Sequence, residues 1–399
     1  MTTRAAATFR PPVMEARRWL DAATPPEGVA LLNVSQAAPV DPPPEALRAE
    51  MARLVAEVPT VHLYGPVLGL PELRDEIAAE WSAAYGGAIG ADQVAVTAGC
   101  NQAFCAAIAA LTTECDEVIL PTPWYFNHRM WLDMAGVRTV PLPCDDALLP
   151  DPERAAAAIT PRTRAIVLVT PNNPGGVEYP AEVVRAFHRL AQERGLALIL
   201  DETYRDFDAR PGAPHDLFAD PDWPRHLVHL YSFSKAYRLT GHRTGAMIAD
   251  AATLAEAEKF LDTVAICPPQ LGQHAALFGL RHLSHWRAGE RAEILDRRAA
   301  IEAGAGGLAE AGWRLKGVGA YFAYLEHPFD LPSDTLARRM ISEIGVLALP
   351  GTMFVPAGDP SGARHLRIAF ANVDRAGIEE LYARLARLAY PLAETGARG

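Results

Sequence analysis

One lysine of the sequence lies in a stretch that is rich in hydroxyl groups and is followed by a glycine-flanked arginine. The stretch covers residues 232–245 and contains Ser232, Ser234, Lys235 and Arg243. A buried lysine can lose its proton and act as an amine nucleophile that forms a Schiff base with an aldehyde. The two serines and the arginine supply hydrogen-bond donors and a charge that suit a phosphate group, which arginine can bind in a bidentate manner. The pattern therefore indicates a ligand that carries both an aldehyde and a phosphate.

Pyridoxal 5'-phosphate (PLP) is such a ligand, and its site needs further groups besides the lysine. It needs a phosphate cup, a partner for the ring nitrogen, a donor to the ring oxygen and a surface that stacks on the ring. Gly99, Cys100 and Asn101 open a predicted helix, whose first amides and dipole suit an anion, and Gly99 permits close approach. Asp201 closes an apolar segment and could pair with the ring nitrogen, which would keep the ring protonated.

The ring oxygen and the ring face also have candidates in the sequence. Tyr204 or Asn173 could donate to the oxygen, and Tyr125 could stack on the ring. Each feature alone has an ordinary explanation, since an aspartate often caps a helix and an aromatic side chain often belongs to the core. Together they are more specific, because each follows the end of a predicted strand.

Short apolar segments alternate with helical patterns through much of the chain. This alternation predicts an α/β fold with a mostly parallel sheet that helices cover on both faces. Ligands of such sheets lie beyond the carboxyl ends of the strands, where the candidate residues are found. The predicted strands are 94–96, 118–120, 137–142, 166–169, 196–200, 227–230 and 246–248, and the predicted helices are 45–58, 70–85, 101–111, 127–134 and 181–193.

The chain is long enough for more than one domain. We expect an N-terminal arm over residues 1–40 that packs with a small domain, a large PLP-binding domain over 41–285, and a small C-terminal α/β domain over 286–399. A long charged helix over 280–308 is expected to join the two domains. The small domain is predicted to contain ordered segments at 321–325, 334–344, 346–354 and 366–370.

Composition excludes several classes of protein. The net charge of -11 and the absence of a Lys/Arg-rich block argue against nucleic acid and anionic membranes as partners. The five cysteines show no C-x-x-C spacing, which argues against a disulfide frame or a bound metal. No signal peptide is visible, and no segment approaches the roughly 20 apolar residues of a membrane span. We therefore expect a cytoplasmic protein.

The motifs resemble those of fold-type I PLP enzymes of the class I/II aminotransferase family over nearly the whole chain. The lysine signature at 232–245 is the most specific match. The others are the turn at 97–99, the asparagine–proline segment at 171–176, the aspartate-x-x-tyrosine at 201–204, a tyrosine-containing segment at 64–74, the segment at 350–354 and the arginine-containing strand at 366–370.

The resemblance implies roles for the matching residues. Lys235 would hold PLP as a Schiff base and move a proton between the substrate α-carbon and the cofactor. Asp201 would pair with the ring nitrogen, and Tyr125 would stack on the ring. Tyr204 and Asn173 would hold the ring oxygen. The phosphate would be bound by Ser232, Ser234, Arg243, the amides of Cys100 and Asn101 at the Gly99 turn, and Tyr64 of a neighbouring subunit.

The same resemblance implies how substrates and subunits are arranged. Arg367 would bind the substrate α-carboxylate, with Ala37 and Asn173 nearby. A tyrosine supplied by a second chain implies a homodimer with shared active sites. The substrates would be an α-amino acid and a 2-oxo acid.

Departures from the family pattern leave substrate and reaction type open. Gly175 replaces the usual threonine, Ala37 replaces a common glycine, and Tyr64 is followed by Gly65 instead of threonine. The alternative to transamination is elimination, replacement or cyclisation on an amino acid by a PLP-dependent lyase, synthase or cyclase. A regulator that senses PLP is a third hypothesis, but it requires a basic DNA-binding module that the sequence does not show.

The sequence gives little indication of the substrate side chain. No second arginine is recognisable as a clamp for a further carboxylate, which disfavours dicarboxylic substrates. Four aromatic residues could instead line an apolar side-chain pocket, namely Trp124, Tyr125, Phe126 and Tyr321.

Overall fold

A seven-stranded sheet forms the largest layer of the protein, whose computed structural model describes residues 3–393. The strand order is β2-β8-β7-β6-β5-β3-β4. Every pair is parallel except the two that β8 makes, with β2 and with β7. The strands are β2 (Val94–Thr97), β3 (Glu117–Thr122), β4 (Arg138–Pro143), β5 (Thr163–Val169), β6 (Ala197–Asp201), β7 (Leu227–Ser232) and β8 (Gly245–Ile248).

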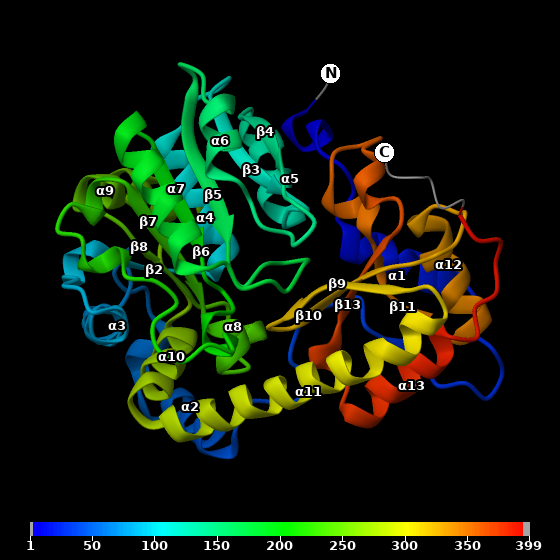
Figure 1. Ribbon diagram of the computed structural model, residues 1–399. Coiled ribbons are helices and arrows are strands. Elements are labelled where there is room, and N and C mark those ends of the chain that lie inside the picture. The colour runs from blue at the N-terminus through cyan, green and yellow to red at the C-terminus, as the bar shows by residue number, and fades with distance from the viewer. Residues whose placement is uncertain (1–2, 394–399) are drawn as a thin grey trace.

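Helices cover both faces of this sheet and extend to the C-terminal part of the chain (Figure 1). They are α1 (Pro12–Ala22), α2 (Glu45–Glu57), α3 (Pro71–Tyr85), α4 (Cys100–Leu111), α5 (Phe126–Ala135), α6 (Pro152–Ala158), α7 (Ala181–Arg194), α8 (Phe233–Ala236), α9 (Ala251–Ala265), α10 (Gln270–His282), α11 (Ser284–Glu310), α12 (Ser333–Ile344) and α13 (Arg375–Leu385).

The central strands are apolar because both of their faces are buried. Ile166 and Leu168 of β5 pack in a core with residues of α3 and α7. Val167, which lies between them, points to the opposite face and packs with residues of α4 and α9. This burial on two sides explains why the strands read as continuous apolar runs rather than as alternating patterns.

A second, antiparallel sheet lies at the C-terminal part of the chain, in the order β12-β13-β10-β9. Its strands are β9 (Arg314–Gly319), β10 (Phe322–Glu326), β12 (Leu349–Pro350) and β13 (His365–Ala369). A short parallel pair joins the N-terminal segment to this region, with β1 (Leu32–Asn33) next to β11 (Val346–Leu347). Figure 1 shows the β9–β10 hairpin reaching toward α8, at the edge of the large sheet.

Helix α11 runs along the lower edge of the molecule and contacts both sheet regions (Figure 1). Near its start, the Arg287 guanidinium lies 2.6 Å from the Glu80 carboxylate of α3. Farther along, Arg297 donates a 2.6 Å hydrogen bond to the carbonyl of Ala371, just after β13. The helix therefore positions the two sheets relative to each other.

The structure confirms the mostly parallel α/β sheet but corrects the helix expected over 280–308. The chain leaves the helical conformation at Leu283, with ψ at 21°, so α10 ends at His282 and α11 begins at Ser284. Leu283 is buried at the break, which lets the two helices pack in different directions. Helices α6, α8, α9 and α13, most of α10, and strand β9 were not expected from the sequence.

The N-terminal arm contacts more than the C-terminal sheet with which it was expected to pack. The Thr8 hydroxyl donates a 3.0 Å hydrogen bond to Asp133 of α5, and β1 pairs with β11. Residues 1–2 and 394–399 of the predicted arm and C-terminal domain lie outside the described residues.

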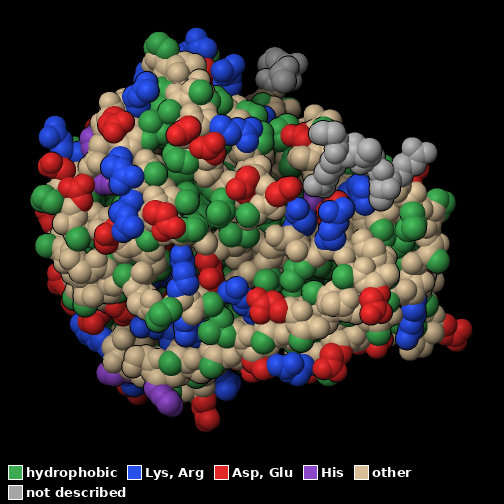
Figure 2. Space-filling model, viewed as in Figure 1, with side chains coloured by type: hydrophobic (Ala, Val, Ile, Leu, Met, Phe, Trp, Pro, Cys, Tyr) green, Lys and Arg blue, Asp and Glu red, His purple; other side chains and the backbone are tan. Residues whose placement is uncertain are grey.

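On the face shown in Figure 2, acidic and basic side chains are interspersed. Within residues 3–393, no helix combines the length and the apolar character needed to cross a bilayer.

Candidate active site

Lys235 lies on α8, a single helical turn that follows the end of β7. The Ser232 hydroxyl caps this turn by accepting a 3.3 Å hydrogen bond from the amide of Ser234. The Lys235 amine donates a 2.6 Å hydrogen bond to the carbonyl of Ala37, in the segment that follows β1. Burial, with help from the nearby Arg243 and Arg367 charges, lowers the pKa of Lys235 to about 8. The unprotonated, nucleophilic form is therefore accessible near neutral pH.

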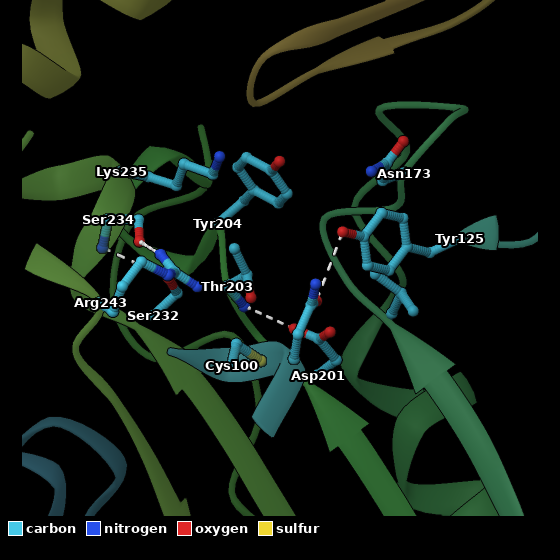
Figure 3. Close-up of a pocket in the computed structure, with 12 residues that line it drawn as sticks. Cys100, Tyr125, Asn173, Asp201, Thr203, Tyr204, Ser232, Ser234, Lys235 and Arg243 are labelled. Carbon is cyan, nitrogen blue, oxygen red and sulfur yellow. Dashed lines mark hydrogen bonds between the residues drawn. The ribbon is translucent and has the colours of Figure 1, made fainter. Parts of the chain in front are cut away.

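A cavity in front of Lys235 brings together most of the site residues that the sequence predicted (Figure 3). Lys235 and Tyr204 lie on one side, Tyr125 and Asn173 on the other, and Asp201 at the base. The lining residues are Cys100, Asn101, Tyr125, Val169, Asn173, Asp201, Thr203, Tyr204, Ser232, Ser234, Lys235 and Arg243. They follow the carboxyl ends of several strands, as expected for a parallel sheet.

Arg243 and the start of α4 form a cationic end of the cavity. Arg243 donates hydrogen bonds of 3.1 Å to the Ser234 hydroxyl and 3.0 Å to the carbonyl of Thr240. Gly99 caps α4 with φ at 85°, and a Cβ there would lie 2.1 Å from a guanidinium nitrogen of Arg243. The first amides of α4 have no partner within the helix, so they and Arg243 converge on one anion site.

Asp201 is a buried carboxylate at the opposite end of the cavity. Its side chain lies 3.1 Å from Nε2 of His128 and accepts a 3.0 Å hydrogen bond from the amide of Thr203. Burial pushes the pKa of Asp201 up, but the interactions with His128 and Thr203 outweigh it and the net shift is downward. Asp201 therefore remains a carboxylate within a buried site.

His128 is a member of the site that the sequence analysis did not identify. It comes from α5, where its ring stacks on Phe104 with the centroids 4.0 Å apart. The signal that could have revealed it is its place one turn after Tyr125, on a helix that opens at the end of β3. The stacking fixes the imidazole, so that its nitrogen faces Asp201.

The other groups along the base of the cavity are neutral donors or acceptors. Burial raises the pKa of both the Cys100 thiol and the Tyr204 hydroxyl well above their usual values. Cys100 is therefore not a thiolate, although it lies at a helix start. The Tyr125 hydroxyl donates to the side-chain oxygen of Asn101 at 3.4 Å and accepts a 2.9 Å hydrogen bond from the side-chain Nδ2 of Asn127.

Arg367 extends from β13 into a wider cavity that adjoins the first. It donates a 3.2 Å hydrogen bond to the Asn173 side chain and a second hydrogen bond to the carbonyl of Ser35. Phe322 and Phe354 flank its guanidinium, each with the ring centroid 5.2 Å away. Burial lowers the pKa of Arg367 to about 10, and its Nε is buried without a hydrogen-bond partner among the described residues. Such an unsatisfied cation is suited to a carboxylate ligand.

The wider cavity, of about 440 Å³, contains only two of the four aromatic residues that could line an apolar side-chain pocket. Tyr125 and Phe126 line it, but Trp124 and Tyr321 are buried outside both cavities. A second arginine, Arg17 of α1, does line it, contrary to expectation. The remaining lining residues are Val13, Met14, Gln36, Ala37, Ala38, Asn127, Asn173, Tyr204, Ser234, Lys235, Thr240, Arg243 and Arg367.

Tyr64 is the one predicted phosphate ligand that lies outside both cavities of its own chain. Its side chain is 79% exposed, in the loop between α2 and α3. Its contribution from a second subunit stays a prediction.

Comparison with known proteins agrees with this geometry. A sequence model of the family described as aminotransferase class I and II matches residues 30–385. The chain belongs to this family. The aspartate/prephenate aminotransferase of Thermus thermophilus is 28% identical over 358 residues, covering 87% of this chain and 88% of that protein. The arginine–pyruvate transaminase of Pseudomonas aeruginosa is 32% identical over 350 residues, covering 86% and 85%.

Solved structures of aminotransferases share the whole architecture. The aspartate aminotransferase of Thermus thermophilus with maleate superimposes with a TM-score of 0.86 at 26% identity, covering 96% of this chain and 98% of that one. An aminotransferase from Mycobacterium tuberculosis superimposes with a TM-score of 0.85 at 27% identity, covering 95% and 97%. The protein is therefore a PLP-dependent aminotransferase of fold type I that acts on amino and oxo acids. These relatives favour amino-group transfer over elimination, replacement or cyclisation.

Proposed function

We propose that this aminotransferase holds PLP on Lys235 and moves the amino group of an α-amino acid to a 2-oxo acid in the cavity described above. The observation that carries the proposal is the buried Lys235, with a pKa of about 8, in a cavity that also holds the Asp201 carboxylate and Arg243. When bound, PLP supplies an aldehyde for the amino group and a ring that withdraws electrons from the substrate α-carbon.

The two ends of the cavity fit the two ends of this cofactor. At one end, Ser232, Ser234, Arg243 and the first amides of α4 would hold the phosphate, and the missing Cβ of Gly99 leaves room for Arg243. At the other, Asp201 would pair with the ring nitrogen, held in place by His128. Tyr204 and Asn173 would hydrogen-bond the ring oxygen, and Tyr125 would lie against the ring.

Arg367 and Lys235 would act on the substrate itself. The guanidinium of Arg367 would bind the α-carboxylate, because its Nε is buried without a partner among the described residues. Asn173 accepts a hydrogen bond from Arg367 and so orients it, while Ala37 lies beside Lys235. The Lys235 amine would take a proton from the α-carbon and return it on the other side of the transferred nitrogen.

We also propose a homodimer in which Tyr64 reaches the phosphate of the partner chain. Large apolar side chains are exposed around this tyrosine, as expected for a covered surface. They are Val55, Leu63, Val264 and Ile266, with exposed fractions of 47%, 62%, 57% and 43%. The amide of Gly65 donates to Cys267 at 3.4 Å, which joins the Tyr64 loop to the end of α9.

We further propose domain limits of 1–40, 41–285 and 286–399, since α11 begins at Ser284 between the two sheets.

An absorption spectrum of the purified protein tests the cofactor and the reaction together. We expect a visible band that is absent from Lys235→Ala protein prepared without substrate. Addition of an amino acid should convert the band to that of the aminated cofactor, with release of one 2-oxo acid. A colourless protein that PLP does not reconstitute would refute the proposal, as would turnover that yields no oxo acid.

A further inference from the structure

Residues 36–38 form part of the wall of the wider cavity, in the segment that follows β1. Gln36, Ala37 and Ala38 line this cavity together with Arg367, but none of the three lines the narrower cavity in which PLP would bind. The position of this wall therefore bears mainly on the substrate rather than on the cofactor.

The wall has few anchors, because β1 ends at Asn33 and residues 36–38 lie beyond it. Within residues 3–393, only Lys235 and Asn372 form hydrogen bonds with the backbone of residues 36–38 from outside this segment. The Lys235 amine donates to the carbonyl of Ala37 at 2.6 Å. Lys235 would use the same nitrogen to hold the cofactor, so Asn372 is the anchor that does not depend on the cofactor.

Asn372 bridges the two sides of Ala37 with one side-chain amide. It lies in a short turn that follows β13, where its Nδ2 donates a hydrogen bond to the carbonyl of Gln36 and its Oδ1 accepts a 3.4 Å hydrogen bond from the amide of Ala38. An asparagine side chain offers both a donor and an acceptor, so it can satisfy both backbone groups of such a bend. Asn372 is partly buried and lines neither of the two adjoining cavities, so any effect on a substrate would pass through residues 36–38.

The same part of the chain also carries Arg367, which precedes Asn372 on β13. Arg367 donates a hydrogen bond to the carbonyl of Ser35. The segment is therefore held by β13 and the turn after it at the carbonyls of residues 35 and 36 and at the amide of residue 38. The guanidinium that would bind the substrate α-carboxylate and the wall beside it thus form one connected unit.

We propose that Asn372 is a positioning residue, which holds residues 36–38 in place so that the α-carboxylate of an amino or oxo acid enters a preformed site beside Arg367. This inference rests on the proposed function, because it assigns the α-carboxylate to Arg367. A segment that is already ordered costs less conformational entropy when a ligand binds against it. Without Asn372, that cost would be added to the binding of every substrate, whatever its side chain.

Asp374, in the same connection to α13, provides a matched control. Its carboxylate caps α13 by accepting a 2.8 Å hydrogen bond from the amide of Gly377. It forms no hydrogen bond with residues 36–38 among the residues that the structure describes. Asp374→Ala should therefore lower the unfolding temperature through the lost cap, but leave KM unchanged.

The test compares Asn372→Ala, Asn372→Leu and Asp374→Ala with the unchanged protein. The donor is the amino acid that converts the cofactor band fastest, and its 2-oxo acid is used in the reverse direction. We expect both Asn372 variants to raise KM for the amino acid and for the oxo acid about three- to tenfold, the range for one or two neutral hydrogen bonds, with kcat nearly unchanged. Leucine keeps the volume of asparagine but not its hydrogen bonds, so agreement between the two variants assigns the effect to the hydrogen bonds.

Absorbance titration with the α-methyl analogue of the same amino acid provides a readout that does not depend on turnover, because this analogue lacks the proton that Lys235 would remove. Its dissociation constant should rise as KM does, while fluorescence titration should give an unchanged affinity for PLP.

An unchanged KM in both Asn372 variants would overturn the inference, as would an equal rise in Asp374→Ala. A parallel loss of PLP affinity, or a cofactor band that is missing from both Asn372 variants, would indicate a general role in folding and would also overturn it. Failure of the proposed function is distinguishable, since the unchanged protein would then show no cofactor band.

Discussion

At the scale of single residues, the pKa of the Lys235 amine lies well below that of a lysine in water. Its pKa of about 8, against 10.5 for an ordinary lysine, arises from burial and from the charges of Arg243 and Arg367. The amine is the form that attacks an aldehyde, and it gains population as pH rises. At pH 7 about a tenth of Lys235 is unprotonated, compared with well under a thousandth of a lysine of unshifted pKa.

The rate at which cofactor-free protein attaches PLP should therefore rise between pH 6 and 8 and level off above about pH 8. Stopped-flow absorbance at a series of pH values measures this rate, with Lys235→Ala as the blank. A rate that continues to climb tenfold per pH unit up to pH 10 would contradict the lowered pKa.

Site residues that lie in short sequence motifs were identified from the sequence. Site residues that only tertiary packing brings to the cavity were not. Asp201, Tyr204 and Lys235 were recognisable because each lies at the end of an apolar strand or within three residues after it. His128 was not, because its role depends on the stacking with Phe104 that turns its ring toward Asp201. Arg17 was missed for a similar reason: α1 lies far from the site in sequence, and only the tertiary fold brings it to the cavity.

At the scale of elements, α4 lies very close to the strands beside it. This close approach sets the shape of the cationic end of the cavity, where the phosphate would bind. A Cβ on Gly99 would meet Arg243 at 2.1 Å, and one on Gly245 of β8 would meet the amide nitrogen of Cys100 at 2.7 Å. Gly245 is thus required for the backbone contact between β8 and the start of α4, and Gly99 leaves the space that the Arg243 guanidinium occupies. The sequence showed glycines at both positions, but not that they face each other.

Gly99→Ala should displace Arg243 and weaken cofactor binding by about tenfold or more, the usual loss when a charge-assisted hydrogen bond is broken. Gly195→Ala is the control, because Gly195 also has a positive φ, of 64°, but no atom lies within 4 Å of its added Cβ. That control should lose roughly 1–2 kcal/mol of stability from backbone strain and keep its affinity for PLP. Fluorescence titration with PLP and thermal unfolding measure the two effects, and equal affinities in the two variants would contradict the clash.

Hydrophobic periodicity located the strands of the large sheet but missed a helix break and a strand. The strands of the large sheet were located within a few residues, because burial on both faces leaves a plain apolar run. The break between α10 and α11 was missed, because Leu283 satisfies the apolar pattern while its backbone leaves the helix. Strand β9 was missed because most of its residues are only half-buried.

At the scale of the whole molecule, one chain accounts for every proposed contact of the site except that of Tyr64. This tyrosine is 79% exposed and is accompanied by the apolar side chains of Leu63 and Ile266. An exposed tyrosine among apolar groups is a frequent component of protein interfaces. If a second copy covers this surface, then each active site combines Lys235 of one chain with Tyr64 of the other.

Hybrid dimers of one inactive and one weakened variant test this arrangement directly. Lys235→Ala should abolish activity, and Tyr64→Ala should weaken PLP binding enough to lower activity at limiting cofactor. In a hybrid dimer, the chain with Lys235→Ala still provides Tyr64 to the site that contains the intact Lys235 of its partner. Hybrid dimers purified away from the two homodimers should therefore regain close to half of the unchanged activity at the same cofactor concentration, because one of their two sites is intact. A site built within one chain predicts no gain over the Tyr64→Ala subunits alone, because the intact lysine and the intact tyrosine would never share a site.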